Sequence, residues 1–323
     1  MNEIGIKNQR FSVGISFSGV PRERAAKALG RLFGAEPEAP PEPSGVWKLR
    51  DRDGKTWKLS YDPLVHGEWK VWKDVLPRWN PAWRVRLESP PLDYGELPKL
   101  EECLQTLQRA GGRVNDSCEM SVHVDAENHN RQSLKNLIGI MYSKEDIMFR
   151  ALKVNEARAA VYSKKVREPL VEQMRSLSCD ETKDMTELEQ IWYEGNVRPD
   201  QPLNKTCRYA LNLHSVFFRN TVEWRCFNAT LNPDRAAAYV NLCLAMSAQA
   251  IAQRSAVIKK TVSENEQFTF RTWLVRLGLN GPEFKQTREI LLENLDGDKA
   301  WLRPKTPESG KKAPKRRRGE AVK

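Results

Sequence analysis

The sequence predicts an α+β fold in which helices cover the outer face of a curved antiparallel sheet, whose concave side forms a pocket. Two patterns support this prediction. Short segments alternate apolar and polar residues with a period of two, as half-buried strands do, and longer segments between them carry apolar residues at helical spacing. With 323 residues, 40% of them hydrophobic, the chain is long enough for one large domain or two ordinary ones.

The first elements follow from local signals. Residues 12–18 (SVGISFS) alternate strictly and form the first predicted strand. Residues 22–33 are predicted to form a helix, because Pro21 suits its start and Gly34 its end. Residues 36–43 (EPEAPPEP) are predicted to be an exposed loop, since proline cannot join a strand ladder.

Residues 46–83 hold six of the ten tryptophans, interleaved with lysines and arginines. Residues 52–55 (RDGK) are typical of a tight turn between two tryptophan-containing strands, which favours packing of the rings in a hairpin. Stacking of the rings on single-stranded bases is the alternative interpretation.

The remaining elements continue the same pattern. Further strands are predicted at residues 85–88, 120–125, 211–214 and 222–226, and further helices at residues 97–110, 133–154, 233–253 and 282–295. We expect an α+β domain over residues 1–260, which includes a variable helical and loop insertion at residues 160–206. A C-terminal helical extension should cover residues 261–302, and a disordered basic tail residues 303–323.

Composition excludes several classes of protein. No apolar run approaches the roughly 20 residues that cross a bilayer, and the N-terminus lacks an apolar signal segment, so we expect a cytoplasmic protein without membrane contact. The six cysteines form no CxxC pair, which favours reduced thiols over a zinc site. Neither a phosphate-binding GxxxxGK[ST] loop nor a strand-linked GxGxxG is present.

The net charge of +11 is concentrated at the C-terminus, where Lys311 to Lys323 include seven basic residues and one acidic residue. This segment is interpreted either as a solubilising end or as a weak contact for nucleic acid or an acidic partner.

The predicted strands are apolar on one face and ionisable on the other. The second face carries Glu88, His123, Asp125, Asn212, His214, Glu223 and Arg225. If this face lines a cavity, its side chains suit a nucleotide and Mg²⁺; a solvated sheet face is the alternative. His66 and His129 lie in polar segments and are expected to face solvent.

Three of these segments together resemble a known family. Residues 117–126 (SCEMSVHVDA), 211–217 (LNLHSVF) and 221–231 (TVEWRCFNATL) are similar to motifs of the putative amidoligase family, and the resemblance extends over most of residues 11–302. It implies a glutamine-synthetase-like fold and an ATP-dependent carboxylate-amine ligase, which forms an amide through an acyl phosphate. Its substrates would be a small-molecule or peptide carboxylate and an amine.

The resemblance also implies site residues. It implies that the catalytic residues are His123, His214, Glu223 and Arg225. It implies that ATP is bound by Arg208, Asn212, Arg225 and Asn228. Mg²⁺ would be bound by Glu88, Asp125 and Glu223. The chain departs from the family pattern at Ser16, Ser18, Arg86 and Ser121, where metal-ligating residues are expected. Hydroxyls and a guanidinium do not concentrate a hard dication, so the metal chemistry should be weakened.

Three functional hypotheses therefore remain after the sequence analysis. The first is an amidoligase with altered metal chemistry, and the second is a catalytically degenerate member that binds a nucleotide, a peptide or a partner protein. The third is a nucleic-acid-associated protein that uses the basic tail and the tryptophan-rich segment.

Overall fold

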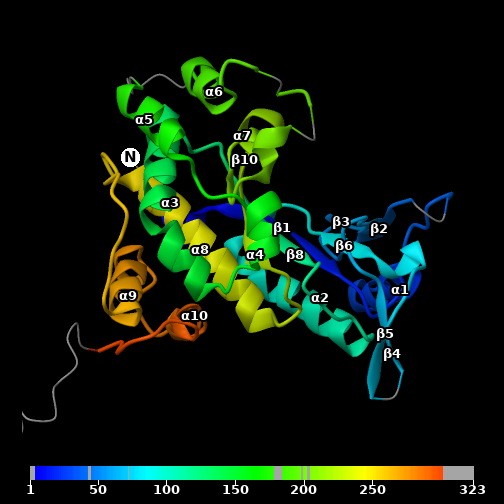
Figure 1. Ribbon diagram of the computed structural model, residues 1–323. Helices are drawn as coiled ribbons and strands as arrows, with labels where there is room; N and C mark the ends of the chain where they lie inside the picture. Colours follow the sequence, from blue (N-terminus) through cyan, green and yellow to red (C-terminus); the bar gives the residue numbers. More distant parts are fainter. Residues whose placement is uncertain are drawn as a thin grey trace, which may run out of the picture.

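A computed structural model describes residues 4–42, 45–71, 73–177, 184–197, 199–201 and 204–300. It confirms a mixed α+β architecture with an antiparallel sheet and packed helices (Figure 1). The predicted basic tail, including Lys311 to Lys323, lies outside the described residues, and its role stays a prediction.

The main sheet consists of strands that are far apart in the sequence. Its order is β2 (Trp47–Arg50), β3 (Thr56–Tyr61), β6 (Val85–Glu88), β1 (Arg10–Phe17), β8 (Glu119–Asp125), β10 (Thr221–Asn228) and β9 (Leu211–Asn212), with β7 (Leu92–Asp93) also pairing with β1. All of these pairings are antiparallel. The period-two alternation places Val13, Ile15, Val122 and Trp224 in the core, where all are buried.

Helices cover this apolar face. The layer is formed by α1 (Arg22–Phe33), α2 (Leu97–Arg109), α3 (Arg131–Ala151) and α8 (Pro233–Ala252), and α8 contacts β8 directly (Figure 1). The alanine-rich sequence of α8 allows close packing, and most of its residues are buried. The helices α9 (Glu266–Arg276) and α10 (Lys285–Leu292) follow it, and α10 also packs on α8.

Shorter helices lie between β8 and β10 in the sequence. These are α4 (Glu156–Val161), α5 (Glu168–Ser176), α6 (Thr186–Trp192) and α7 (His214–Arg219). Short 3-10 helices cover Ile6–Asn8, Pro81–Trp83, Tyr94–Glu96 and Lys205–Arg208. Figure 1 shows α7 next to β10, on which it packs, and α6 further out at the top of the view.

The tryptophan-rich segment forms two hairpins. The turn predicted at residues 52–55 connects β2 to β3: Asp51 Oδ1 accepts the backbone N–H of Asp53 (3.0 Å) and Lys55 (2.9 Å), and Gly54 adopts a φ of +78°. Trp57 is fully buried against Phe33, as the packing interpretation predicts. The second hairpin pairs β4 (Glu68–Val71) with β5 (Asp74–Pro77) and extends from the body as an arm (Figure 1).

Two predictions about histidines were wrong. The strand predicted to reach His214 ends at Asn212, because Asn212 Oδ1 accepts the backbone N–H of His214 (3.0 Å) and turns the chain out of the sheet into α7. His129 does not face solvent but is 3% exposed, and its ring lies 3.0 Å from Ser133 Oγ and 2.9 Å from Ser247 Oγ. His66 is exposed, as predicted.

Candidate functional site

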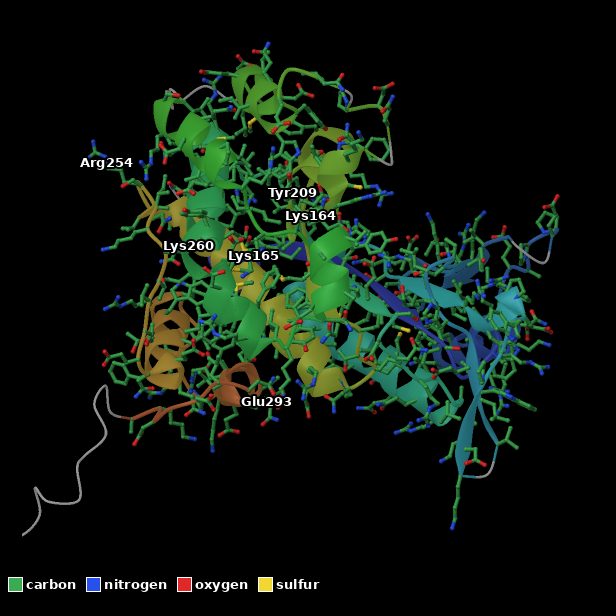
Figure 2. All side chains as sticks on the ribbon, in the orientation of Figure 1. Lys164, Lys165, Tyr209, Arg254, Lys260 and Glu293 are labelled. Carbon is green, nitrogen blue, oxygen red and sulfur yellow. The ribbon has the colours of Figure 1, made fainter. Side chains whose placement is uncertain are left out.

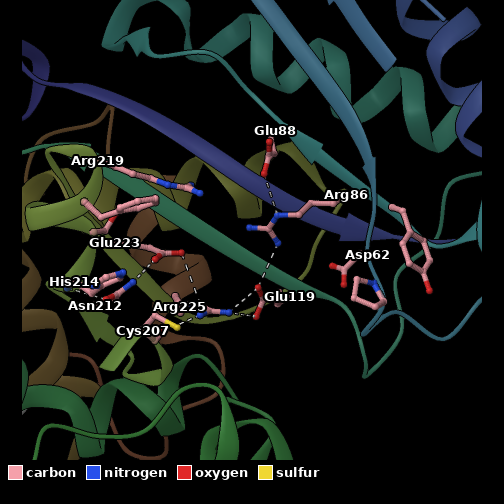
Figure 3. A pocket seen from close by; sticks show the side chains of 14 residues that line it. Asp62, Arg86, Glu88, Glu119, Cys207, Asn212, His214, Arg219, Glu223 and Arg225 are labelled. Carbon is pink, nitrogen blue, oxygen red and sulfur yellow. Dashed lines mark hydrogen bonds and ion pairs between the residues drawn. The ribbon is translucent and has the colours of Figure 1, made fainter. Parts of the chain in front are cut away.

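A cavity of about 270 Å³ lies over the polar face of the sheet, between β6, β8 and β10, residues 61–63 and α7 (Figure 3). Its lining residues are Tyr61, Asp62, Pro63, Arg86, Glu88, Glu119, Cys207, Asn212, His214, Ser215, Phe218, Arg219, Glu223 and Arg225. Five of the seven ionisable or polar residues expected on this face therefore line one recess: Glu88, Asn212, His214, Glu223 and Arg225.

The guanidinium of Arg86 lies at the centre of the polar face. It donates to Ser16 Oγ (3.3 Å), Ser121 Oγ (2.9 Å) and Glu119 Oε1 (3.3 Å), and its Nε lies 3.7 Å from Glu88 Oε1. To reach Ser121 on β8, it crosses β1 above Gly14, where a Cβ atom would lie 2.2 Å from Nη2. Glycine at this position leaves room for the guanidinium.

Glu119 is the shared counterion of three arginines. Arg225 Nη2 donates to both carboxylate oxygens (3.0 and 3.2 Å), and Arg158 Nη2 donates to Oε2 (3.3 Å), in addition to the contact from Arg86. Burial alone would raise the pKa of Glu119, but the guanidiniums of Arg225, Arg86 and Arg158 outweigh it, and the pKa is lowered. The carboxylate is thus held in its charged form.

A β-bulge in β10 helps to aim Arg225 into this cluster. The register of β10 against β8 shifts between Trp224 and Phe227, so two residues of β10 oppose one residue of β8. Arg225 also donates from Nη1 to the backbone oxygen of Cys207 (2.7 Å). Burial lowers the pKa of Arg225, but Glu119 and Glu223 reverse this effect and raise it.

Glu223 connects the arginine cluster to His123 and Asn212. Its Oε2 accepts a hydrogen bond from Asn212 Nδ2 (2.5 Å), and its Oε1 lies 3.4 Å from His123 Nε2 and 3.8 Å from Arg225 Nε. Burial lowers the pKa of His123 and outweighs the opposite effect of Glu223, so the neutral imidazole is favoured.

The first turn of α7 places His214 at the cavity wall. Its Nδ1 lies 2.5 Å from the hydroxyl of Tyr193, and its ring stacks on Phe218 with the centroids 5.6 Å apart. Burial lowers the pKa of His214 as well. Both histidines predicted to be catalytic are therefore held in polar contacts near the cavity, while their catalytic roles stay predictions.

Two charged groups of the cavity are available to a ligand. Arg219 is exposed at the end of α7 and forms no ion pair with the described residues, and its guanidinium lies 5.5 Å from the Phe218 ring. The Glu88 side chain is 42% exposed and has only the distant contact to Arg86 among the described ion pairs.

Other residues implied by the resemblance lie elsewhere. Asp125 pairs with Arg10 at the far end of β8. Asn228 accepts the backbone N–H of Asn155 (3.1 Å) and donates to the backbone oxygen of Lys153 (2.7 Å). Arg208 is exposed, lies over the Tyr162 ring and does not line the cavity. The structure does not bring these three residues together with the cavity side chains.

The side chains present do not fit a Mg²⁺ site. Among the described residues no group of three or more His, Cys, Asp or Glu side chains could hold a metal ion. Ser16 donates to Asp62, and the Ser18 hydroxyl bonds with the backbone of Glu68 and Trp83. Arg86 places a positive charge among the positions where metal ligands are expected.

Sequence reasoning missed four residues of the site. Glu119 shares a face of β8 with Ser121 and His123, so the period-two pattern already contained the signal that would have identified it. Asp62, Arg158 and Arg219 come from a loop and two short helices, which gave no such signal.

The comparisons with known proteins agree with the sequence motifs. A protein-family model described as "Putative amidoligase enzyme" matches residues 7–247. A search of curated proteins finds no match to the chain. None of the helices in the described part of the chain has the length and apolar character needed to span a bilayer.

Proposed function

The chain belongs to the putative amidoligase family, whose name indicates a ligase-type function on small molecules. We propose that this chain binds a small zwitterionic ligand without Mg²⁺-dependent ligation. The ligand class is an amino acid or a short peptide, which carries both a carboxylate and an ammonium group. The glutamine-synthetase-like fold, ATP and Mg²⁺ that the resemblance implies are not needed for this function.

The position of Arg86 carries the proposal. Its guanidinium donates to Ser16 and Ser121, two positions where the family resemblance implies metal ligands. A dication placed there would be repelled by Arg86, and hydroxyls alone would not compensate for this repulsion. Ligation through an acyl phosphate depends on neutralising the phosphates, so loss of the metal site favours binding over turnover.

The charge balance of the cavity favours a zwitterion over a nucleotide. The lining includes three guanidiniums (Arg86, Arg219 and Arg225) and four carboxylates (Asp62, Glu88, Glu119 and Glu223). Arg158 adds a fourth guanidinium on Glu119, so the charges balance, and a polyanion such as ATP would meet no surplus of positive charge to hold it. Arg219 suits a ligand carboxylate, and Glu88 and Asp62 suit an ammonium group.

The size of the cavity fits the same ligand class. A volume of about 270 Å³ is just below the usual range of small-molecule pockets, which begins near ~300 Å³. Phe218, which is 37% exposed, adds apolar surface beside Arg219.

The test is isothermal titration calorimetry with a panel of free amino acids and dipeptides, in buffer containing EDTA. We expect at least one ligand to bind with an affinity that Mg²⁺ does not change. Arg219→Gln should weaken that binding by about tenfold or more, because a charge-assisted hydrogen bond is lost. Arg271→Gln on α9, also exposed and outside the cavity, is the matched control and should bind like the unmodified protein.

A second measurement separates this function from ligation. The protein is incubated with ATP, Mg²⁺ and pairs of carboxylates and amines, and ADP release is followed. Substrate-stimulated, Mg²⁺-dependent ADP release would refute the proposal and support the amidoligase reaction. Binding that is insensitive to Arg219→Gln would refute the assigned ligand orientation.

A further inference from the structure

A second cavity, of about 450 Å³, lies between the β4–β5 arm and the C-terminal end of α2. Its side chains include Arg24, Lys70, Arg109 and Arg113, together with Trp69 and Trp83. The arm is tied to the body nearby, since the backbone N–H of Gly19 donates to the backbone oxygen of Glu68 (3.1 Å). This cavity shares no lining residue with the cavity over the polar face.

The charges of this second cavity are unbalanced. Its lining contains four basic side chains and no acidic one, and none of the four forms an ion pair with another described residue. Helix stability does not explain the cluster: Arg109 suits the C-terminal end of α2, but Arg24 lies in the first turn of α1, where a positive charge is unfavourable. An anionic ligand would relieve the mutual repulsion.

Aromatic rings accompany these charges. Trp69 and Trp83 pack edge to face with the centroids 6.2 Å apart, and Arg78 lies 4.8 Å from the Trp69 ring. Trp79 is 83% exposed and lines another cavity at the arm, together with the basic Arg78 and Arg84 and the acidic Glu68. Basic groups in one cavity and an exposed ring in a second cavity on the same arm suit a chain of nucleotides better than one nucleotide.

We propose that the β4–β5 arm, the exposed Trp79 beside it and the end of α2 form a binding site for single-stranded nucleic acid. Phosphates contact Arg24, Arg109 and Arg113, while a base stacks on Trp79. The proposal does not depend on the function proposed for the first cavity, nor on the basic segment at the C-terminus.

The experiment measures fluorescence anisotropy of labelled single-stranded 12-mers of DNA and RNA with the full chain. The test variant is Arg109→Glu/Arg113→Glu, in which both side chains are exposed and free of ion pairs with described residues. The matched control is Arg254→Glu/Lys259→Glu, which has the same charge change. Figure 2 shows Arg254 on the opposite side of the molecule from the arm.

We expect the test variant to bind at least about tenfold more weakly than the control at the same salt concentration. The slope of log affinity against log salt should also fall by about 1.4, since each phosphate contact to a single strand contributes ~0.7. Trp79→Ala, which removes an exposed ring, should weaken binding by about fivefold or more while leaving the melting temperature unchanged.

Three results would overturn the proposal. Equal affinities of the test and control variants would show that the arm contributes no more than general positive charge. If duplex DNA of the same length binds as tightly as the single strands, stacking of unpaired bases on tryptophan does not contribute to the affinity. Binding that disappears when residues 311–323 are deleted, but is unchanged in Arg109→Glu/Arg113→Glu, would assign it to the C-terminal segment.

Discussion

Replacement of Glu119 by Gln tests whether the arginine cluster depends on one carboxylate. The substitution keeps the shape of the side chain but removes its charge. Glu119 accepts four hydrogen bonds, from Arg86 (3.3 Å), Arg225 (3.0 and 3.2 Å) and Arg158 (3.3 Å), and its side chain is 11% exposed. The variant therefore leaves three guanidiniums without their shared counterion.

The penalty falls mainly on Arg158. Arg86 keeps Glu88 at 3.7 Å and Arg225 keeps Glu223 at 3.8 Å, whereas Arg158 is 8% exposed and has no other carboxylate among the described ion pairs. Removing one partner of a buried ion pair typically costs about 3 to 5 kcal/mol. At about 2 °C per kcal/mol for a chain of this size, the melting temperature should fall by about 6 to 10 °C.

The assay is urea unfolding followed by circular dichroism, with Glu172→Gln as the control. Glu172 pairs with Arg175 at 3.2 Å, but both side chains are 54% exposed, so the control should lose less than about 1 kcal/mol. A similarly small loss for Glu119→Gln would show that the protein tolerates Arg158 buried without a carboxylate partner, and would refute the predicted dependence of the cluster on Glu119.

The pH dependence gives an independent readout of the same group. The pKa of Glu119 is lower in the folded protein than its ordinary value of 4.5, so its contribution is present above that pH and is lost as the pH falls below it. The difference in unfolding free energy between the unmodified protein and Glu119→Gln should therefore shrink as the pH falls from 6 towards 3.

Three further predictions concern stability. Ser16→Glu should lower the melting temperature by several degrees, because Ser16 is fully buried between Asp62 and Arg86 and a larger side chain does not fit there without displacing them. Burial lowers the pKa of His129 from 6.5 to about 4, so the unfolded state binds the proton first and stability falls as the pH drops from 6.5 to 4; His129→Gln should flatten this dependence in urea titrations. Burial raises the pKa of Glu96, but hydrogen bonds from Lys55, Asp93 and Lys99 lower it to about 2, so Glu96→Gln should reduce the loss of stability between pH 4.5 and 2, measured by thermal melts.

The sequence predicted those parts of the fold that short-range patterns determine. The helix predicted at residues 22–33 has these bounds in the structure, because Pro21 precedes it and Gly34, with a φ of +72°, ends it. The alternation in β1, β8 and β10 identified the apolar and polar faces of the sheet. These signals depend only on neighbouring residues, so one sequence is sufficient to read them.

The parts that sequence analysis missed depend on contacts between distant segments. The direction of His214 is set by the hydrogen bond that its backbone N–H donates to Asn212 Oδ1, which alternation does not encode. Arg158 reaches Glu119 from a short helix 39 positions along the chain. Trp57 and Trp79 belong to the same tryptophan-rich segment, but Trp57 is buried because β3 pairs with β2 in the main sheet, whereas Trp79 follows β5 outside the strands and is 83% exposed.

The departures from the family pattern at Ser16, Arg86 and Ser121 are consistent with one another. They lie on three neighbouring strands, and the two hydroxyls accept hydrogen bonds from the guanidinium. If metal-binding residues stood at positions 16 and 121, Arg86 would repel the dication that they bind. If the two serines were present without Arg86, Glu119 would have one guanidinium fewer as a counterion. A guanidinium offers fixed, directional donors and no open coordination site, so the three departures together agree with the binding function proposed above rather than with metal-dependent phosphate chemistry.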